Sequence, residues 1–409
     1  MLKRVALLHY SAPPVVGGVE SVLAQHARLM ADAGHSVRVI AARGAQFDPR
    51  VPFVAVPLAD SRHPDVLTVK SQLDAGVCPP GFAELVSALT GSLRQVLADV
   101  DVVIAHNVCS LNKNLALTAA LRNGYDCAGA FHLILWHHDL AWTTPRYRAE
   151  LHAGYPWDLI RQDWPGARHV VVSELRQREL AELIGLPPER IAVIPSGVDV
   201  AAFLKLEPQT REFLARLQLL DAEPLLLLPV RITPRKNIEL ALRALAALRE
   251  TCPRAGLVVT GPPGPHNPAN ADYFVRLKAL RSELGLSGAA HFLAELSDAY
   301  LPDEVIADFY RLADALLLPS REEGFGIPLI ESGLARLPVF CTDIAPLRAL
   351  GGDQATYFSP DADPHQVAAL IAERLLGDPE YEFTARVRRE YLWERIYAQK
   401  IAPLLVSEP

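Results

Sequence analysis

The chain has 409 residues, of which 50% are hydrophobic and 21% charged, a composition typical of globular proteins and long enough for two domains with separate cores. Its formal net charge of −7 excludes the basic surface of a nucleic-acid-binding protein. Five scattered cysteines without a C-x2-C pair, and no apolar run of the roughly 18 residues that a membrane span needs, predict a cytoplasmic protein with reduced thiols and no transmembrane segment.

The first half of the chain alternates strand-like and helix-like segments, which predicts an α/β domain with a parallel sheet. A helix with an apolar face is expected from Val19 to about Gly34. The expected strands are Arg4–His9, Ser36–Ala42, Asp101–His106, Phe131–Trp136, His169–Ser173, and a strand and turn over Ile191–Asp199.

Gly17 and Gly18 stand in the loop between the first strand and this first helix. Bare backbone at a helix start lets a phosphate or a sugar approach closely, although a plain structural turn would use the same residues. The loop is not G-x-G-x-x-G and no acidic residue ends the second strand, so the dinucleotide-binding fingerprint is absent.

The second half repeats the alternation, which predicts a second doubly wound α/β domain. Its expected strands are Leu225–Val230, Gly256–Gly261, His291–Leu293, Ala315–Pro319 and Pro338–Thr342. Its expected helices are Ile238–Leu248, Asp303–Ala313 and a closing helix over about 381–403.

The stretch that follows the strand Ala315–Pro319 is the most informative part of the chain. A polar turn holds Glu323 and Gly326, and from Ile327 the apolar spacing becomes helical, with Pro328 in the first turn, where its missing N–H costs nothing. Open α/β sheets bind anionic ligands at such a strand–turn–helix junction. Glu323 and Glu331 are two carboxylates that suit the vicinal hydroxyls of sugar rings.

Residues 323–331 read EGFGIPLIE, which resembles the signature of the retaining glycosyltransferases of family four (glycosyltransferase group 1), which have the GT-B fold. The segment IAVIPSGVD (191–199) and the Gly17-Gly18 loop resemble the same family. The resemblance implies two Rossmann-like domains that face a cleft. Residues 1–199 would form the acceptor domain, 200–380 the nucleotide-sugar donor domain, and 381–409 a helix that crosses back to the first domain.

The resemblance also implies catalytic roles. Arg231 and Lys236 match the family's diphosphate clamp, with Arg235 as the alternative to Lys236. His138, in the setting His-Asp-Leu, would lie beside the reacting carbon of the donor sugar, with His137 as the alternative.

The remaining donor contacts follow from the signature and the glycine loop. Glu323 and nearby amides would orient the sugar hydroxyls, and Glu331 would hold the ribose. The residues expected to bind the donor are Gly17, Gly18, Gly326, Ile327, Pro328, Leu329 and Glu331. In the family's mechanism the leaving diphosphate itself takes the proton of the acceptor, so no metal and no cofactor is expected.

Two formal D-x-D pairs, Asp99/Asp101 and Asp361/Asp363, match the metal motif of a different glycosyltransferase fold. The first pair precedes a strand instead of ending one, and the second pair begins a helix. Neither is expected to bind a metal.

The acceptor is expected to be a small anion, because arginines and aromatic side chains crowd residues 141–166 and a polar turn precedes them in the first half. A surface excursion with solvated arginines is the alternative reading. A lipid acceptor also stays open, although the sequence shows no basic amphipathic helix near the N-terminus that would favour one. The candidate acceptor-binding residues are Asn112, Lys113, Arg146, Arg148 and Arg161.

Together these features predict a retaining, metal-independent glycosyltransferase. It would move a hexose from a nucleotide diphosphate sugar, of the UDP-glucose or GDP-mannose class, to a small hydroxylated acceptor. Two alternatives use the same residues: a retaining disaccharide phosphorylase of the same fold, and a non-catalytic sugar-nucleotide-binding protein. Nothing in the sequence specifies an oligomeric state.

Overall fold

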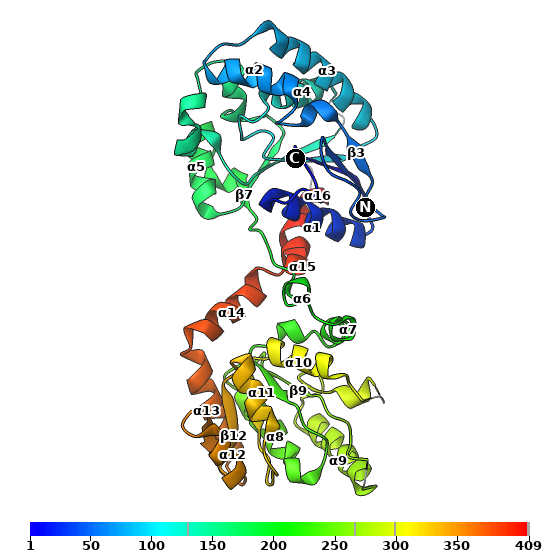
Figure 1. Cartoon of the computed structure of the whole chain (residues 1–409), viewed down its shortest axis with the longest axis vertical. Coiled ribbons are helices and arrows are strands. Elements are labelled where there is room, and N and C mark those ends of the chain that lie inside the picture. Colours follow the sequence, from blue (N-terminus) through cyan, green and yellow to red (C-terminus); the bar gives the residue numbers. More distant parts are fainter. Residues whose placement is uncertain (129–130, 266, 298–299, 407–409) are drawn as a thin grey trace. The chain divides into compact units, whose positions relative to one another are not determined.

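The computed structural model describes residues 1–128, 131–265, 267–297 and 300–406, without the side chains of residues 127 and 128. It divides into two compact units (Figure 1). Unit 1 comprises Met1–Val198 and Tyr391–Pro409, and unit 2 comprises Asp199–Glu390. Cys78, Cys109, Cys252 and Cys341 are free thiols, and the side chain of Cys127 lies outside the described residues.

Unit 1 is built on a seven-stranded sheet of parallel strands in the order β3-β2-β1-β4-β5-β6-β7. The chain adds strands on one side of β1 and then on the other, so the direction reverses between β1 and β4. Open α/β sheets form ligand crevices at such a switch point, outside the carboxyl ends of the strands. The strands are β1 (Arg4–Leu8), β2 (Ser36–Ala41), β3 (Phe53–Ala55), β4 (Val102–His106), β5 (His132–His137), β6 (Arg168–Val171) and β7 (Ile191–Val193).

The sheet of unit 1 has a hydrophobic core on each face, because alternate side chains of a strand point to opposite faces. Ala6 and Leu8 of β1 pack in one core, and Val5 and Leu7 pack in the other. The α-helices of unit 1 are α1 (Gly18–Asp32), α2 (Pro64–Asp74), α3 (Pro80–Val96), α4 (Leu115–Ala128), α5 (Glu174–Ile184), α15 (Trp393–Ile396) and α16 (Ala402–Val406). Residues 50–100, which carried no recognisable motif, form β3 and the helices α2 and α3.

The closing segment is not the single helix that the apolar spacing predicted over about 381–403. Helix α14 ends at Glu390, and the chain then runs extended beside Val198, whose amide donates to the Tyr391 carbonyl (2.7 Å). Trp393 packs so closely on Gly197 that a Cβ there would lie 2.7 Å from the indole ring. The break follows from this pairing and packing, which the local sequence does not encode. After α15 the chain continues through a π-helix (Tyr397–Ile401) into α16.

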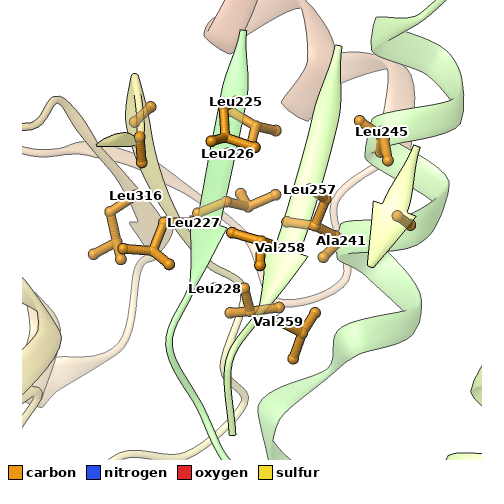
Figure 2. Packing of buried hydrophobic residues seen from close by; sticks show 14 of the residues in the cluster. Leu225, Leu226, Leu227, Leu228, Ala241, Leu245, Leu257, Val258, Val259 and Leu316 are labelled. Carbon is orange, nitrogen blue, oxygen red and sulfur yellow. The ribbon is translucent and has the colours of Figure 1, made fainter. Parts of the chain in front are cut away.

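Unit 2 holds a six-stranded parallel sheet in the order β10-β9-β8-β11-β12-β13. All four residues of β8 are buried leucines (Figure 2), as expected for a central strand covered by helices on both faces. The strands are β8 (Leu225–Leu228), β9 (Gly256–Val259), β10 (Ala290–Phe292), β11 (Ala315–Leu318), β12 (Val339–Thr342) and β13 (Thr356–Phe358).

The helices of unit 2 cover this sheet, and α8 has the bounds that the sequence predicted. They are α6 (Val200–Phe203), α7 (Pro208–Leu217), α8 (Ile238–Leu248), α9 (Ala269–Glu283), α10 (Asp303–Leu312), α11 (Ile327–Ala335), α12 (Ala345–Gly351), α13 (Pro364–Leu376) and α14 (Pro379–Glu390).

Helix α11 differs from the expectation in which side it buries. Ile327 and Leu334, which the spacing placed on its apolar face, are 59% and 84% exposed. The buried residues are Leu329 and Ser332, because Leu329 packs against the neighbouring helix α12. Apolar spacing identified the helix and not its orientation.

No helix in the described ranges combines the length and the apolar character needed to cross a membrane.

Candidate functional site

The centre of the candidate site in unit 2 is a buried ion pair between Lys236 and Glu323. Lys236 Nζ lies 2.5 Å from Glu323 Oε1, which also accepts a hydrogen bond from Ser320 Oγ (2.7 Å). Thr342 Oγ1 donates to the Ser320 carbonyl (2.5 Å) and ties this turn to β12. Glu323 follows β11 and Lys236 follows β8, and the two strands are neighbours. The pair therefore lies at the carboxyl edge of the sheet, where α/β proteins place their ligands.

Lys236 is the buried cation of this loop, with only 7% of its surface exposed. Burial lowers the pKa of its ammonium group, while the contact with Glu323 favours the charged form. Arg235, the alternative residue, is exposed, and its guanidinium lies 3.8 Å from Glu323 Oε2 and donates to the Glu322 carbonyl (3.2 Å). Both cations approach Glu323, and Lys236 forms the shorter contact.

Arg231 lies in the same loop, on its exposed side, and makes no hydrogen bond or ion pair within the part of the chain that the structure describes. The loop itself is pinned. The Ile232 amide donates to the Pro262 carbonyl (2.9 Å), and a Cβ at Gly261 would lie 2.3 Å from the Val230 carbonyl oxygen. The guanidinium of Arg231 is therefore available to bind a ligand, on a loop whose backbone is fixed.

Gly326 begins helix α11 in a backbone conformation that favours glycine. Its φ is +106°, and a Cβ there would lie 2.7 Å from a Leu347 methyl carbon. Pro328 has no amide hydrogen, and the Leu329 amide donates back to the Gly326 carbonyl (3.0 Å). The amides of Gly326 and Ile327 are therefore the donors of this turn that a ligand can use.

Glu331 accepts a hydrogen bond from the hydroxyl of Tyr310 (2.5 Å). Tyr310 comes from α10 and is almost fully buried, and its burial raises the pKa of the phenol. Sequence reasoning missed this partner because it stands 21 residues before Glu331 on another helix. Tyr310 fixes the carboxylate of Glu331 on the surface of unit 2.

In unit 1 the two glycines before α1 have different structural roles. A Cβ at Gly17 would lie 2.1 Å from Glu20 Oε2, whereas one at Gly18 would meet nothing within 4 Å. Ser11 Oγ donates to Glu20 Oε1 (2.6 Å) and holds this carboxylate in place. Packing alone thus explains Gly17, while no contact explains Gly18.

His138 is held from two sides at the end of β5. Its Nε2 lies 3.1 Å from His106 Nδ1, and its amide donates to Asn107 Oδ1 (2.7 Å). Asn107 has a φ of +58°, a left-handed conformation that Asn adopts more readily than most residues. Burial lowers the pKa of His138 to about 3, so the imidazole is neutral at physiological pH.

His137 is engaged in a different hydrogen-bond chain. Its Nε2 lies 3.1 Å from His169 Nδ1, and His169 Nε2 lies 3.1 Å from Asp163 Oδ1. Neighbouring residues of a strand point to opposite faces, and here the two histidines bond to different partners. His137 and His138 therefore cannot substitute for each other.

His26 is a third buried histidine, with its ring 4.5 Å from that of Trp136 and 5.4 Å from that of Trp393. Neither of its ring nitrogens has a hydrogen-bond partner among the described residues, and burial lowers its pKa to about 3. In the unfolded chain the imidazole of His26 has a pKa of ~6.5. Between pH ~6.5 and the folded pKa, the unfolded chain binds a proton at His26 that the folded protein does not bind. The free energy of unfolding therefore falls as the pH falls.

We therefore expect His26→Leu to reduce the acid sensitivity of unit 1. Between pH 7.5 and 5.0, wild type should lose about 2 kcal/mol more stability than the variant. This is the free energy expected because pH 5.0 lies about 1.5 pH units below the pKa of an unfolded histidine, at about 1.4 kcal/mol per unit. All five tryptophans (136, 142, 157, 164 and 393) belong to unit 1, so urea unfolding followed by tryptophan fluorescence reports this unit alone. Parallel stability–pH profiles for the two proteins would contradict the expectation.

The candidate acceptor residues make different contacts. Asn112 donates to Glu150 (2.7 Å), and Arg161 pairs with Asp158 (2.8 Å). Arg146 lies over the ring of Tyr147, and Arg148 is exposed. Lys113 lines a cavity of unit 1.

The carboxylates of the two D-x-D pairs have structural partners. Asp99 pairs with Arg38 (2.7 Å) and Asp101 with Arg4 (2.6 Å), and the second contact lowers the pKa of Asp101 to about 2. Asp361 pairs with Arg321, and Asp363 caps helix α13. Within the described ranges, no group of three or more His, Cys, Asp or Glu side chains is arranged to hold a metal ion.

Comparison with family models identifies both halves of the chain. Residues 16–202 match the model for Glycosyltransferase Family 4, and residues 209–389 match the model for glycosyl transferases group 1. The chain belongs to the family 4 glycosyltransferases. Its two parallel α/β sheets are the GT-B architecture that the signature implied, and its class is that of a hexosyltransferase.

This glycosyltransferase has relatives along its whole length. The D-inositol 3-phosphate glycosyltransferase of Thermobispora bispora is 29% identical over 406 residues, covering 93% of this chain and 88% of the relative. The MMP alpha-(1->4)-mannosyltransferase of Mycolicibacterium hassiacum is 27% identical, covering 98% and 97%. The D-inositol 3-phosphate glycosyltransferase of Kineococcus radiotolerans is 33% identical over 226 residues, and the match spans 49% of its length and 52% of this chain.

Among solved structures, Anabaena HepE in complex with UDP aligns with 98% of this glycosyltransferase and 99% of its own chain, at 17% identity and a TM-score of 0.36. The family assignment rests on the sequence comparisons and not on this likeness.

Proposed function

We propose that this glycosyltransferase moves a hexose, with retention of anomeric configuration and without a metal ion, from a nucleotide diphosphate sugar to a small anionic acceptor that carries hydroxyl groups. The observation that carries the proposal is the buried Lys236–Glu323 pair, in the same unit as the uncommitted guanidinium of Arg231. Arg231 and Lys236 are two cations at the carboxyl edge of a parallel sheet, and two cations at this place suit a diphosphate.

In this proposal unit 2 holds the donor. Arg231 and Lys236 stabilise the negative charge that develops on the diphosphate as its bond to the sugar carbon lengthens. Glu323 and the amides of Gly326 and Ile327 orient the sugar hydroxyls, while Glu331 accepts hydrogen bonds from the ribose diol.

The acceptor hydroxyl attacks the anomeric carbon as the bond between that carbon and the diphosphate oxygen breaks. The proton of the hydroxyl passes to the departing diphosphate. His138, neutral and fixed by His106, offers a hydrogen-bonding imidazole to the sugar. Holding both substrates in position supplies much of the rate.

The names of the relatives support an anionic acceptor and a choice of donors. Two of them are named for D-inositol 3-phosphate, a phosphorylated polyol, and one is named as a mannosyltransferase. UDP-glucose and GDP-mannose are accordingly the first donors to test, with inositol phosphates as the first acceptors.

A nucleotide and acceptor panel tests this function. Thermal unfolding is followed with UDP, GDP and ADP and their sugar conjugates, because a ligand at 100 times its dissociation constant stabilises the protein by about 2.7 kcal/mol. Turnover of the stabilising donor is then measured with D-inositol 3-phosphate, with and without EDTA, and NMR assigns the anomer of the product.

Each outcome of the panel identifies one reading. A retained anomer at an EDTA-insensitive rate supports the proposal. An inverted anomer or loss of the rate in EDTA contradicts it. Cleavage of a disaccharide by inorganic phosphate identifies the phosphorylase alternative, and stabilisation by a nucleotide sugar without turnover of any donor identifies a binding protein.

Tyr310→Phe is expected to weaken binding of the nucleoside diphosphate about tenfold, because it frees the Glu331 carboxylate from the hydroxyl that positions it. If Tyr310 acts by positioning Glu331, the affinity for inorganic pyrophosphate should be unchanged, since pyrophosphate contains no ribose diol. Both affinities are measured by calorimetric titration of wild type and of the variant. An equal loss for both would contradict the role of Tyr310.

A further inference from the structure

Unit 1 contains a cavity of about 320 Å³. The loops that follow four of its strands contribute to the cavity, those after β1, β2, β3 and β4. The lining residues are His9, Tyr10, Ser11, Val15, Val16, Glu20, Arg43, Ser61, Arg62 and Lys113. Since the sheet is parallel and its order reverses between β1 and β4, the cavity opens at the switch point, at the carboxyl ends of the strands.

The lining carries three cationic side chains against one carboxylate. Arg43 is committed to Asp60, at 2.9 Å. Arg62 and Lys113 are exposed, and neither forms an ion pair or a side-chain hydrogen bond within the described part of the chain. The cavity therefore presents two guanidinium or ammonium groups whose donors are unused, and such groups bind phosphate oxygens well.

The one lining carboxylate, Glu20, forms no ion pair with Arg62 or Lys113 within the described part of the chain. Glu20 Oε1 accepts the hydrogen bond of Ser11 (2.6 Å) and lies 3.9 Å from His9 Nε2. Burial lowers the pKa of His9, and the charge of Lys113 lowers it further, so His9 is neutral and Lys113 lies near it. Glu20 is thus committed to Ser11, and its second oxygen lies against Gly17.

The volume limits what the cavity can hold. Small-molecule sites range from roughly 300 to 1,000 Å³, and this cavity is at the lower limit. This volume suits a single phosphorylated ring or a short polyol phosphate. Ser11 Oγ donates its proton to Glu20 and can still accept a hydrogen bond from a hydroxyl group of such a ligand.

We propose that this cavity is the acceptor site and that Arg62 and Lys113 bind the phosphate group of a phosphomonoester acceptor. The inference rests on the proposed function, and it names the substrate class and the residues that select it. It assigns the anion to the loops after β3 and β4 and not to the arginines of residues 141–166, of which Arg161 is paired and Arg146 lies over a tyrosine ring. The donor diphosphate has separate cations in unit 2, Arg231 and Lys236.

Calorimetric titration with inorganic phosphate tests the site without any turnover. Wild type is expected to bind phosphate, and Arg62→Ala or Lys113→Ala is expected to weaken that binding about tenfold or more, the usual loss for a hydrogen bond between charged groups. Arg94→Ala is the matched control, because Arg94 is an exposed cation on α3 that does not line the cavity. Lys113→Arg keeps the charge and should retain most of the affinity.

Titration with UDP and GDP separates the acceptor phosphate from the donor diphosphate. Arg62→Ala and Lys113→Ala should leave the dissociation constant of the nucleotide within about twofold of wild type. An equal loss for inorganic phosphate and for the nucleotide would place the donor in this cavity and overturn the proposal. Absence of phosphate binding in wild type, or equal binding in the variants, would also overturn it.

Acceptor kinetics supply the second arm once a donor is known. The KM for D-inositol 3-phosphate should rise about tenfold or more in both variants, while the KM for inositol without phosphate should stay near that of wild type. Equal rises for both acceptors would contradict recognition of the phosphate group. Lack of turnover in wild type would contradict the proposed function alone, because the phosphate titration does not depend on it.

Discussion

Replacing Lys236 or Glu323 by alanine is expected to lower the turnover of this glycosyltransferase about 10²-fold or more. Each substitution removes one member of the buried pair whose Nζ and Oε1 atoms lie 2.5 Å apart. Loss of one preorganised electrostatic stabiliser costs about 3 kcal/mol of transition-state stabilisation. The measurement is kcat with saturating donor and acceptor, together with the thermal midpoint of each variant.

The two variants should differ in what they lose. Lys236→Ala removes a cation that stabilises the leaving diphosphate, so kcat and kcat/KM should fall together. Glu323→Gln preserves the shape of the side chain and one oxygen for Ser320, so it separates the charge from the packing. We expect it to retain the folded structure and to lose most of the activity.

Arg321→Ala is the matched control for this pair. Arg321 is an exposed cation in the same turn, and it pairs with Asp361 on the surface. Exposed ion pairs contribute roughly 0–1 kcal/mol, so its removal should change kcat by no more than a few fold. Near-normal kcat in Lys236→Ala and Glu323→Ala, with normal midpoints, would remove both residues from the active site.

The fold was largely predictable because its signals are local. The leucine run of β8, the Leu- and Ala-rich helix α8 and the turn before α11 each carry their pattern within about a dozen residues. The three-residue strands β3 and β13 have no such pattern, and their existence depends on the neighbouring strand. The orientation of α11 likewise depends on α12 and not on its own spacing.

The candidate site was predictable where the chain carries a motif and not where it depends on tertiary partners. The signature contains Glu323 and Glu331, but Tyr310 and Ser320 gain their roles only when α10 and β11 are folded beside the loop. The same limit applies to the acceptor cavity. Arg62 and Lys113 stand about fifty residues apart and line the same cavity only in the folded sheet. The arginines of residues 141–166 are conspicuous in the sequence, but Arg161 is paired with Asp158 and Arg146 lies over the ring of Tyr147.

A second buried ion pair, between Asp314 and Arg388, lies within unit 2. Arg388 Nη2 lies 2.7 and 2.6 Å from the two oxygens of Asp314, and the Leu225 amide donates to the same carboxylate (2.7 Å). Both side chains are almost fully buried. Burial raises the pKa of the Asp314 carboxyl even though Arg388 favours its charged form. The desolvation of the pair therefore outweighs the attraction that Arg388 supplies to the carboxylate.

We expect Asp314→Ala to destabilise unit 2 by about 3–5 kcal/mol, because the guanidinium of Arg388 that is left buried cannot lose its proton. We expect Arg388→Met to destabilise unit 2 less, because the carboxyl of Asp314 that is left buried can take up a proton and become neutral. Arg388 lowers the pKa of the Asp314 carboxyl, so in Arg388→Met the folded state holds the proton of Asp314 more tightly than in wild type. The deficit of Arg388→Met relative to wild type should therefore shrink as the pH falls from 7 toward 5. Unit 2 contains no tryptophan. Its unfolding is therefore the transition seen by calorimetry that has no matching change in tryptophan fluorescence. Equal costs for the two variants at pH 7, or a deficit of Arg388→Met that grows on acidification, would show that Asp314 stays charged when it is unpaired.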